Sequence, residues 1–322
     1  MIRDVPRARA LLVLPTLSLW ACINTTAGPT DATAEADAGA QADASGFPDA
    51  MGFADATGLP DAMGFPDAQT QSGDSGVHPD ATVADAGTSG VNCQTPDLLF
   101  CDDFEAYAAG NAQSNKWRNN TASANSTLQI ETDAAHVRGQ KSLHVHANQN
   151  EFSYIRVTNF APPNNSFFGR VWTYVDAFPS APAYAHWTMV ETTGQNPPNL
   201  GVIRPIGGQY DPQGNAADWG VGSDGGPTGD WCNWNPQAPT HPGQWVCLEW
   251  EVRASDTSIR VWIDGTAHPE LTVTAANKAG LVFPTFDSVW FGWWLYQGGP
   301  TPDHYDVWFD DIALRTTRVG CD

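Results

Sequence analysis

Six polar residues in the second half of the chain could together transfer protons on an acidic sugar. Tyrosine and histidine can act as general bases or acids, and arginine or glutamine can neutralise a carboxylate. β-Elimination of a uronic acid requires both functions, because the proton to be removed lies beside a carboxylate and the leaving oxygen must be protonated. The candidates are Arg170, His186, Arg204, Gln209, Tyr296 and Gln297.

Five of these candidates have an expected role in such a reaction. We expect Tyr296 to act as acid and base, and His186 is a second candidate for the base. Arg170, Arg204 and Gln209 are expected to neutralise the carboxylate of the sugar. For each of them the alternative is an ordinary hydrogen-bonded strand residue.

Aromatic residues near these polar groups predict a carbohydrate-binding surface. Residues 93–322 hold 13 of the 14 tryptophans, more than a core of this size needs. In "VWFGWWLYQ", Trp290 and Trp294 share one face of a strand, and Phe291 and Trp293 share the other. One of the two faces is expected to be core, and flat aromatic rings on the other can stack on sugars. Together with Trp172 and Glu191, these two are the candidate substrate-binding residues. Plain core packing is the alternative.

The elements that must position these side chains are predicted to be strands. In "QWVCLEWEVRA", Val246, Leu248 and Trp250 alternate with Glu249 and Glu251, which is typical of a strand with one buried face. Similar patterns recur between loops rich in glycine, proline and asparagine, and we find no amphipathic helical pattern of ten residues. The sequence therefore predicts an all-β fold, with two antiparallel sheets packed as a jelly roll.

The chain divides into three predicted parts. Residues 1–22 combine a basic stretch with a short apolar run, as in a secretory signal. Residues 23–92 are rich in Pro, Ala, Asp and Gly and contain the repeats "GFPDAM", "GFADAT", "GLPDAM" and "GFPDAQ", which indicate a disordered linker. Residues 93–322 are long enough for one large core and are expected to form the carbohydrate-active domain.

The end of the leader resembles a bacterial lipoprotein signal. In "LWAC", Leu19 stands three residues before Cys22 and the small Ala21 directly precedes it. The resemblance implies that Cys22 is lipidated and that the exported protein is anchored to the cell envelope or surface. We expect the lipid to be its one membrane contact, since the chain lacks an apolar run of spanning length. An ordinary cleaved signal and a secreted protein are the alternative.

Charge and missing motifs exclude two classes of partner. The chain has 15 Lys and Arg against 36 Asp and Glu, a formal net charge of −21. Residues 93–322 hold 12 of the basic residues and 24 of the acidic ones. Such an acidic body repels nucleic acid at long range. Because P-loop and dinucleotide-binding motifs are also missing, neither nucleic acid nor a nucleotide is expected as a partner.

An ordered set of segments resembles a known family. The set includes "LFCDDFEAYAAG", "GQKSLHVHA", "FFGRVWTYVD", "QWVCLEWE", "IRVWIDG" and "VWFDDIALRTTRVGC". It is similar to the cellulose-induced-protein-like family, a concanavalin A-like jelly roll related to alginate and glucuronan lyases, over nearly all of Leu99–Cys321. The resemblance implies this fold, a polysaccharide partner and, if the protein is an enzyme, lyase-like activity.

The resemblance also bears on the reaction. Alginate-type lyases carry a tyrosine and a glutamine near a late strand, which Tyr296 and Gln297 in "LYQ" resemble, although the Lys-Ala-Gly upstream in those lyases reads "FGWW" here. Jelly-roll glucanases place catalytic carboxylates as Glu-x-Asp-x-Glu, and Glu249 and Glu251 lack the middle aspartate. A glycoside hydrolase is therefore disfavoured, and a non-catalytic carbohydrate-binding lipoprotein stays open as the alternative.

The family resemblance further implies one structural Ca²⁺. "DFE" and "FDD" mark the acidic ends of the expected first and last strands. The implied ligands are Glu105 and Asp310 or Asp311, with backbone oxygens from the loop 136–142. Several hard oxygen donors suit Ca²⁺ better than a transition metal. Solvated carboxylates without an ion are the alternative.

The strand pairing implied by this metal site leads to a disulfide prediction. Placing Glu105 opposite Asp310 brings Cys321 opposite about residue 94, and Cys101 opposite about Leu314. Two further cysteines flank the turn "QAPTHPGQ". The expected bridges are Cys93–Cys321 and Cys232–Cys247, with Cys101 free and a Cys93–Cys101 bridge as the alternative.

Overall fold

The structure, a computed structural model, covers most of the predicted carbohydrate-active domain. It describes residues 93–180, 182, 184–196, 199–225, 229, 231–296 and 302–321. The predictions for Cys22, for the parts 1–22 and 23–92, and for Gln297 lie outside these residues. Within the described part, no helix has the length and apolar character needed to cross a membrane.

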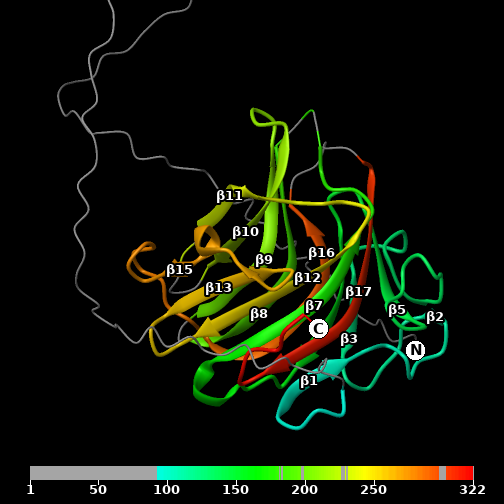
Figure 1. The fold of residues 1–322 in the computed structure, drawn as a ribbon, viewed down its shortest axis with the longest axis horizontal. Helices are drawn as coiled ribbons and strands as arrows, with labels where there is room; N and C mark the ends of the chain where they lie inside the picture. The colour runs from blue at the N-terminus through cyan, green and yellow to red at the C-terminus, as the bar shows by residue number, and fades with distance from the viewer. Residues whose placement is uncertain are drawn as a thin grey trace, which may run out of the picture. The chain divides into compact units, whose positions relative to one another are not determined.

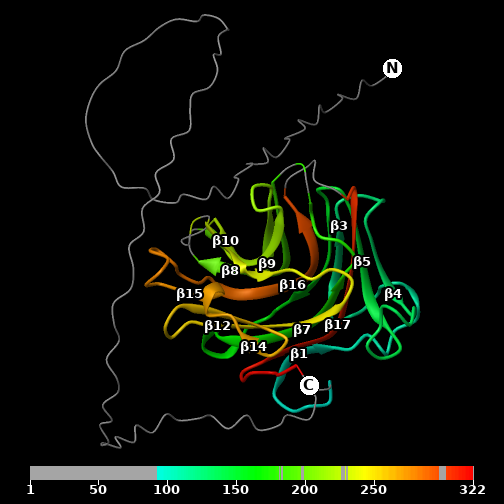
Figure 2. The same ribbon diagram turned by 45° about the horizontal axis from the view of Figure 1, so that its top comes forward.

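Two antiparallel sheets stacked on one another form the described body (Figures 1 and 2). Sheet A has ten strands: in spatial order β14 (Thr266–Ala267), β13 (Ser258–Ile263), β12 (Trp245–Arg253), β7 (Phe167–Val175), β17 (His304–Arg315), β5 (Ser142–Asn148), β4 (Thr127–Glu131) and β2 (Gly110–Asn111), with β1 (Leu98–Asp102) beside β17 and β15 (Val273–Thr274) beside β13. Sheet B has seven: β11 (Trp231–Pro239), β10 (Ala216–Asp224), β9 (Asn199–Asp211), β8 (Ala185–Asn196), β16 (Thr285–Leu295), β6 (Phe152–Thr158) and β3 (Arg118–Thr121).

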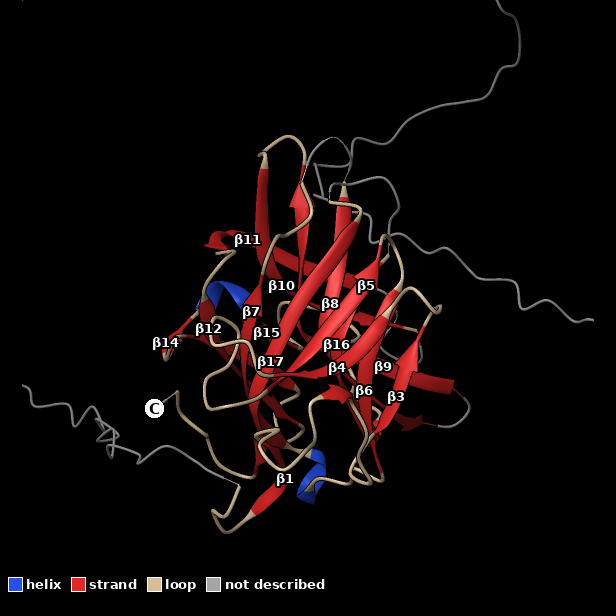
Figure 3. Cartoon of the chain, turned by 90° about the vertical axis from the view of Figure 1, so that its right-hand side faces the viewer, coloured by secondary structure: helices blue, strands red, loops and turns tan. Residues whose placement is uncertain are grey.

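Strands account for nearly all regular structure in the described part. Two short 3-10 turns, η1 (Pro163–Asn165) and η3 (Pro269–Leu271), lie in the connections between strands (Figure 3). The all-β jelly roll predicted from the sequence is thereby confirmed.

The core between the sheets is built from every second residue of the long strands. Phe291 and Trp293 of β16 are fully buried there, and Trp293 stacks on Trp187 of β8 with ring centroids 5.7 Å apart. From sheet A, Trp250 of β12 lies against Gly169 of β7, where a Cβ atom would come within 2.1 Å of the indole ring. In both strands, apolar residues two positions apart are buried together on one face, which confirms the predicted alternation of β12 and β16.

The register of the first and last strands was nearly correct, but both predicted disulfides are wrong. β1 pairs with β17 so that Cys101 faces Ala313, one residue from the expected Leu314. The bridges observed are instead Cys93–Cys101 and Cys247–Cys321, which also excludes a free Cys101. Beyond β17 the chain leaves the ladder and brings Cys321 to β12, so the register of β1 does not determine its partner.

Two histidines of β5 share one carboxylate of β17. Asp306 Oδ1 accepts hydrogen bonds from His144 Nε2 at 2.7 Å and His146 Nδ1 at 2.8 Å. Burial alone raises the pKa of Asp306, but these two hydrogen bonds outweigh it and lower the pKa from 3.8 to about 2. A depressed folded-state pKa stabilises the fold above the unfolded value, and the contribution is lost as the pH falls through the folded value.

We therefore predict a pH-dependent cost for Asp306→Asn. The variant should lose about 2 kcal/mol of unfolding free energy at pH 7 and almost none near pH 2. Urea unfolding at both pH values measures this difference. Asp303→Asn, which removes a carboxylate that is 79% exposed and contacts His304, is the matched control and should change little at either pH. An equal loss at both pH values for Asp306→Asn would contradict the assignment.

Candidate functional site

The side of sheet B that faces away from the core carries most of the predicted site residues. We call this side the outer face of sheet B. On β16 the core residues alternate with Trp290 and Trp294, and Trp290 is buried without belonging to the core cluster between the sheets. Trp290 lies opposite Glu191 of β8, and His186 of β8 lies opposite Gln209 of β9. Cross-strand partners point to the same side of a sheet, so these residues share the outer face.

Tyr296, His186 and Arg204 are in direct contact on this face. The Tyr296 and His186 rings stack with centroids 4.6 Å apart, and the Tyr296 backbone N–H donates to the His186 carbonyl at 3.1 Å. The Arg204 guanidinium lies 4.8 Å from the centre of the Tyr296 ring. Burial is the main cause that raises the pKa of Tyr296, although Arg204 acts in the opposite direction. The phenol is therefore protonated at neutral pH.

A buried ion pair between Arg204 and Glu191 lies beside this contact. Glu191 accepts Arg204 Nε at 3.3 Å and the Trp290 indole N–H at 2.8 Å, and Arg204 Nη2 also contacts Asp224 at 3.0 Å. Burial raises the pKa of Glu191, and Arg204 partly offsets this. Burial lowers the pKa of Arg204, but Tyr296, Glu191 and Asp224 outweigh it and hold the pKa above its ordinary value. Arg204 is thus a fixed positive charge beside Tyr296.

A small pocket opens next to His186 and Arg204. It is bounded by strands β8 to β11, and Trp234 of β11 forms one wall with its ring 5.7 Å from that of His186. Glycines such as Gly207 and Gly220 line its floor, and a Cβ atom at Gly220 would come within 3.0 Å of the Trp234 ring. The missing side chains leave a space of about 10 Å³ beside His186, which is itself 3% exposed.

The outer face is aromatic, but Trp290 does not have the predicted role. Its side chain is 1% exposed and is covered by Tyr154 of β6, whose ring centroid lies 4.6 Å away. Trp290 therefore cannot stack on a sugar, and its N–H positions Glu191 instead. Trp294 is half-buried, stacks on Tyr296 with ring centroids 5.0 Å apart, and contacts the tilted ring of Phe152 at 4.9 Å. Sequence reasoning missed Tyr154 and Trp234, because the strand pairings that bring them here are long-range.

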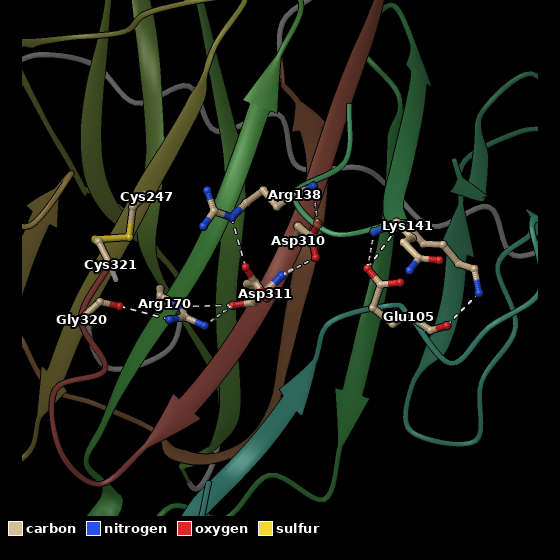
Figure 4. Close-up of polar contacts among 10 residues, drawn as sticks. Glu105, Arg138, Lys141, Arg170, Cys247, Asp310, Asp311, Gly320 and Cys321 are labelled. Carbon is tan, nitrogen blue, oxygen red and sulfur yellow. Dashed lines mark hydrogen bonds and ion pairs between the residues drawn. A yellow bond between two sulfur atoms is a disulfide. The ribbon is translucent and has the colours of Figure 1, made fainter. Parts of the chain in front are cut away.

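Arg170 and Trp172 do not share this site, so their prediction as partners of Tyr296 is wrong. Both belong to β7 in sheet A, and the pleat directs them to the side of that sheet that faces away from the core. Arg170 is 2% exposed and donates to the carbonyl oxygens of Asp311 at 3.1 and 3.2 Å and of Gly320 at 3.3 Å (Figure 4). Trp172 is covered by the Arg138 guanidinium, 3.4 Å from its ring centre.

The three predicted metal ligands lie at and beside the central strand β17 of sheet A, close to Arg170 (Figure 4), but their carboxylate oxygens are not all within 4.8 Å of one another. Asp310 accepts the Arg138 backbone N–H at 3.0 Å, and Glu105 accepts the Gln140 backbone N–H at 2.6 Å, so both contact the loop 136–142. Asp311 is paired with the Arg138 side chain at 3.1 Å. Burial and the neighbouring carboxylates of Asp311 and Glu105 raise the pKa of Asp310 to about 7. Asp310 is the buried carboxylate of the three, and its charge is the feature that a divalent cation would offset.

The two stacked sheets define a jelly-roll protein, and a family match places it in the polysaccharide lyase-like class. The family model for the Cip1-like core domain matches residues 103–317, and the chain belongs to this family. Among curated proteins, none matches the sequence.

Three solved structures illustrate the likeness in fold. The cellulose-induced protein Cip1 is 23% identical with a TM-score of 0.49, over 69% of this chain and 100% of that one. An endo-β-1,4-glucuronan lyase from the fungus Trichoderma reesei is 14% identical with a TM-score of 0.47, over 65% and 95%. An endo-1,3-β-glucanase from Streptomyces sioyaensis is 17% identical with a TM-score of 0.44, over 68% and 96%.

Proposed function

We propose that this protein binds a uronic-acid-containing polysaccharide on the outer face of sheet B and cleaves it by β-elimination. The observation that carries the proposal is the stacked contact of Tyr296 with His186 beside the fixed charge of Arg204. Membership of the polysaccharide lyase-like family and the aromatic side chains around the contact support it.

The two proton transfers of the reaction can be divided between Tyr296 and His186. A base removes the proton at C5, the C4–O bond breaks as a C4–C5 double bond forms, and an acid protonates the leaving oxygen. Tyr296 is assigned the acid role, because burial keeps its phenol protonated, and this role requires the groups that bury its hydroxyl to move aside when a substrate binds. His186, in contact with it at the edge of the pocket, is assigned the base, and Arg204 and Gln209 are assigned to the developing negative charge.

Binding without cleavage is the second candidate function, and one observation favours it. Arg204 already contacts two carboxylates, Glu191 and Asp224, so part of its charge is offset before a substrate arrives. A glycoside hydrolase is less well supported. Glu249 and Glu251 are held in sheet A by Arg318 at 2.8 Å and Arg260 at 2.7 Å, away from the outer face of sheet B.

Incubation of the purified protein with glucuronan, alginate and pectate separates these functions. Lyase action produces an unsaturated uronate, whose ultraviolet absorbance rises with time. Retention of one polymer without such a rise would support the binding function. If all polymers remain intact and unbound, both functions are excluded.

We also propose that Glu105, Asp310 and the loop 136–142 hold a structural Ca²⁺, with Asp311 as an alternative ligand. The ion would offset the repulsion that raises the pKa of Asp310. We predict that Ca²⁺ at about 1 mM raises the melting temperature by about 4 °C or more, and that Asp310→Asn removes this increase. Asp287→Asn, on the other sheet, is the control and should keep it. A melting temperature that does not respond to Ca²⁺ would exclude the ion.

We further propose that the protein is exported and anchored by a lipid on Cys22, with residues 23–92 as a spacer. The "LWAC" sequence and the composition of the spacer support this. Labelling with a fatty acid tests it, because wild-type protein should incorporate the label and a Cys22→Ala variant should not. Release of unlabelled wild-type protein into the medium would indicate secretion instead.

A further inference from the structure

Two arginines lie side by side at one end of the outer face of sheet B. Arg118 of the edge strand β3 is paired with Arg156 of β6, and Arg156 in turn is paired with Trp290 of β16. Trp290 is paired with Glu191 of β8. These four residues therefore form one row across four strands, with two cations at its β3 end and the Glu191–Arg204 ion pair at the other.

Neither arginine of this pair forms a direct ion pair with a carboxylate among the described residues, although the charge of Arg156 acts on Glu191. Arg156 Nη2 donates to Thr193 Oγ1 at 3.1 Å, while its Nε is buried without a hydrogen-bond partner in the described part of the chain. Arg118 is exposed. In contrast, Arg204 and Arg260 each contact two carboxylates. Like charges directly opposite each other in a β-ladder are destabilising, so the pair is costly unless an anion lies between the two guanidinium groups.

The surroundings indicate what kind of anion this is. Tyr154 lies two residues before Arg156 on the same side of β6, and its ring covers Trp290. The hydroxyls of Thr193 and Ser288, 2.6 Å apart, lie on the other side of Arg156. The two hydroxyls are buried and hold the Arg156 guanidinium, whereas Arg118 is exposed to a ligand. A planar guanidinium binds a carboxylate through two parallel hydrogen bonds.

We propose that Arg118 and Arg156 form a subsite that binds a carboxylate of the polysaccharide and so selects uronate polymers over neutral ones. This inference rests on the proposed function and concerns the same face. Trp290, opposite Arg156, donates to Glu191, which is paired with Arg204 beside Tyr296. The subsite is therefore next to the Tyr296–His186 contact without being part of it. Arg118 and Arg156 are assigned to substrate binding, and their loss should mainly raise KM.

The test compares binding of two oligosaccharides of equal length, one from glucuronan and one from cellulose, by titration calorimetry. For the wild type we expect tighter binding of the uronate. For an Arg118→Gln/Arg156→Gln variant, its Kd should weaken about 10- to 100-fold, while the Kd of the neutral oligosaccharide stays the same. Arg253→Gln in sheet A removes a similarly exposed cation and is the control for net charge, with both Kd values unchanged.

Each outcome separates the subsite from the proposed function. If wild-type protein binds both oligosaccharides equally, or the double variant keeps its preference for the uronate, the subsite is overturned while polysaccharide binding stands. If wild-type protein binds neither, both proposals fail. Arg156→Lys provides a second check, since a charge without the planar fork should recover only part of the lost affinity.

Discussion

Tyr296→Phe is expected to lower kcat for polymer cleavage by about 100- to 10,000-fold and to leave binding of the polymer intact. The variant removes only the hydroxyl that protonates the leaving oxygen, and general acid catalysis contributes a factor of this size. The ring that stacks on His186 and Trp294 remains. Initial rates of unsaturated product formation measure kcat, and titration with an oligosaccharide measures binding.

Tyr305→Phe is the matched control for this change. Tyr305 is also buried, at 1% exposure, but it lies in the core, where its ring stacks on Trp293 at 4.9 Å. Both substitutions remove one buried phenol oxygen, so a general loss of packing would affect both variants. We expect full activity for Tyr305→Phe. Full activity for Tyr296→Phe as well would contradict the assignment of Tyr296 as the acid.

Arg204→Met is expected to destabilise the fold by about 3–5 kcal/mol. The substitution removes the partner of Glu191, which is 6% exposed and would be left as an uncompensated buried charge. Asp224, its other partner, is 49% exposed and can be hydrated when the arginine is lost. Denaturant unfolding followed by tryptophan fluorescence measures the change.

A second substitution distinguishes this cause from lost packing. Glu191→Gln in the Arg204→Met background removes the unpaired charge and keeps an oxygen that can accept the Trp290 indole N–H. We expect the double variant to recover at least half of the lost stability, with a positive coupling energy between the two sites. If the stability losses of the two substitutions simply add, the cost of Arg204→Met comes from lost packing and not from the unpaired charge of Glu191.

Local patterns in the sequence were sufficient to predict the strands and their buried faces. In β12, Val246, Leu248 and Trp250 are buried as the alternation requires, and in β16 the core face of Phe291 and Trp293 was one of two stated possibilities. Both inferences use a period of two residues, which depends only on neighbours in the chain. They do not depend on which strands become partners.

The composition of the site depends on those partners and was predicted less well. His186, Arg204 and Tyr296 meet because β8 lies between β9 and β16, whereas Arg170 lies in sheet A. The sequence around Arg118 and Tyr154 did not mark them as site residues, because each reaches the site only through the strand that pairs with its own. The position of Cys321 likewise depends on a segment that leaves the ladder after β17.

The mass of the product released from glucuronan tests the central claim most directly. β-Elimination cleaves the polymer without adding water, so mass spectrometry of the wild-type digest should show oligomers whose new end is one water lighter than a hydrolysis product. Tyr296→Phe should produce almost none of them. Oligomers of the fully hydrated mass, or a polymer that stays bound but uncut, would contradict cleavage by Tyr296 and His186.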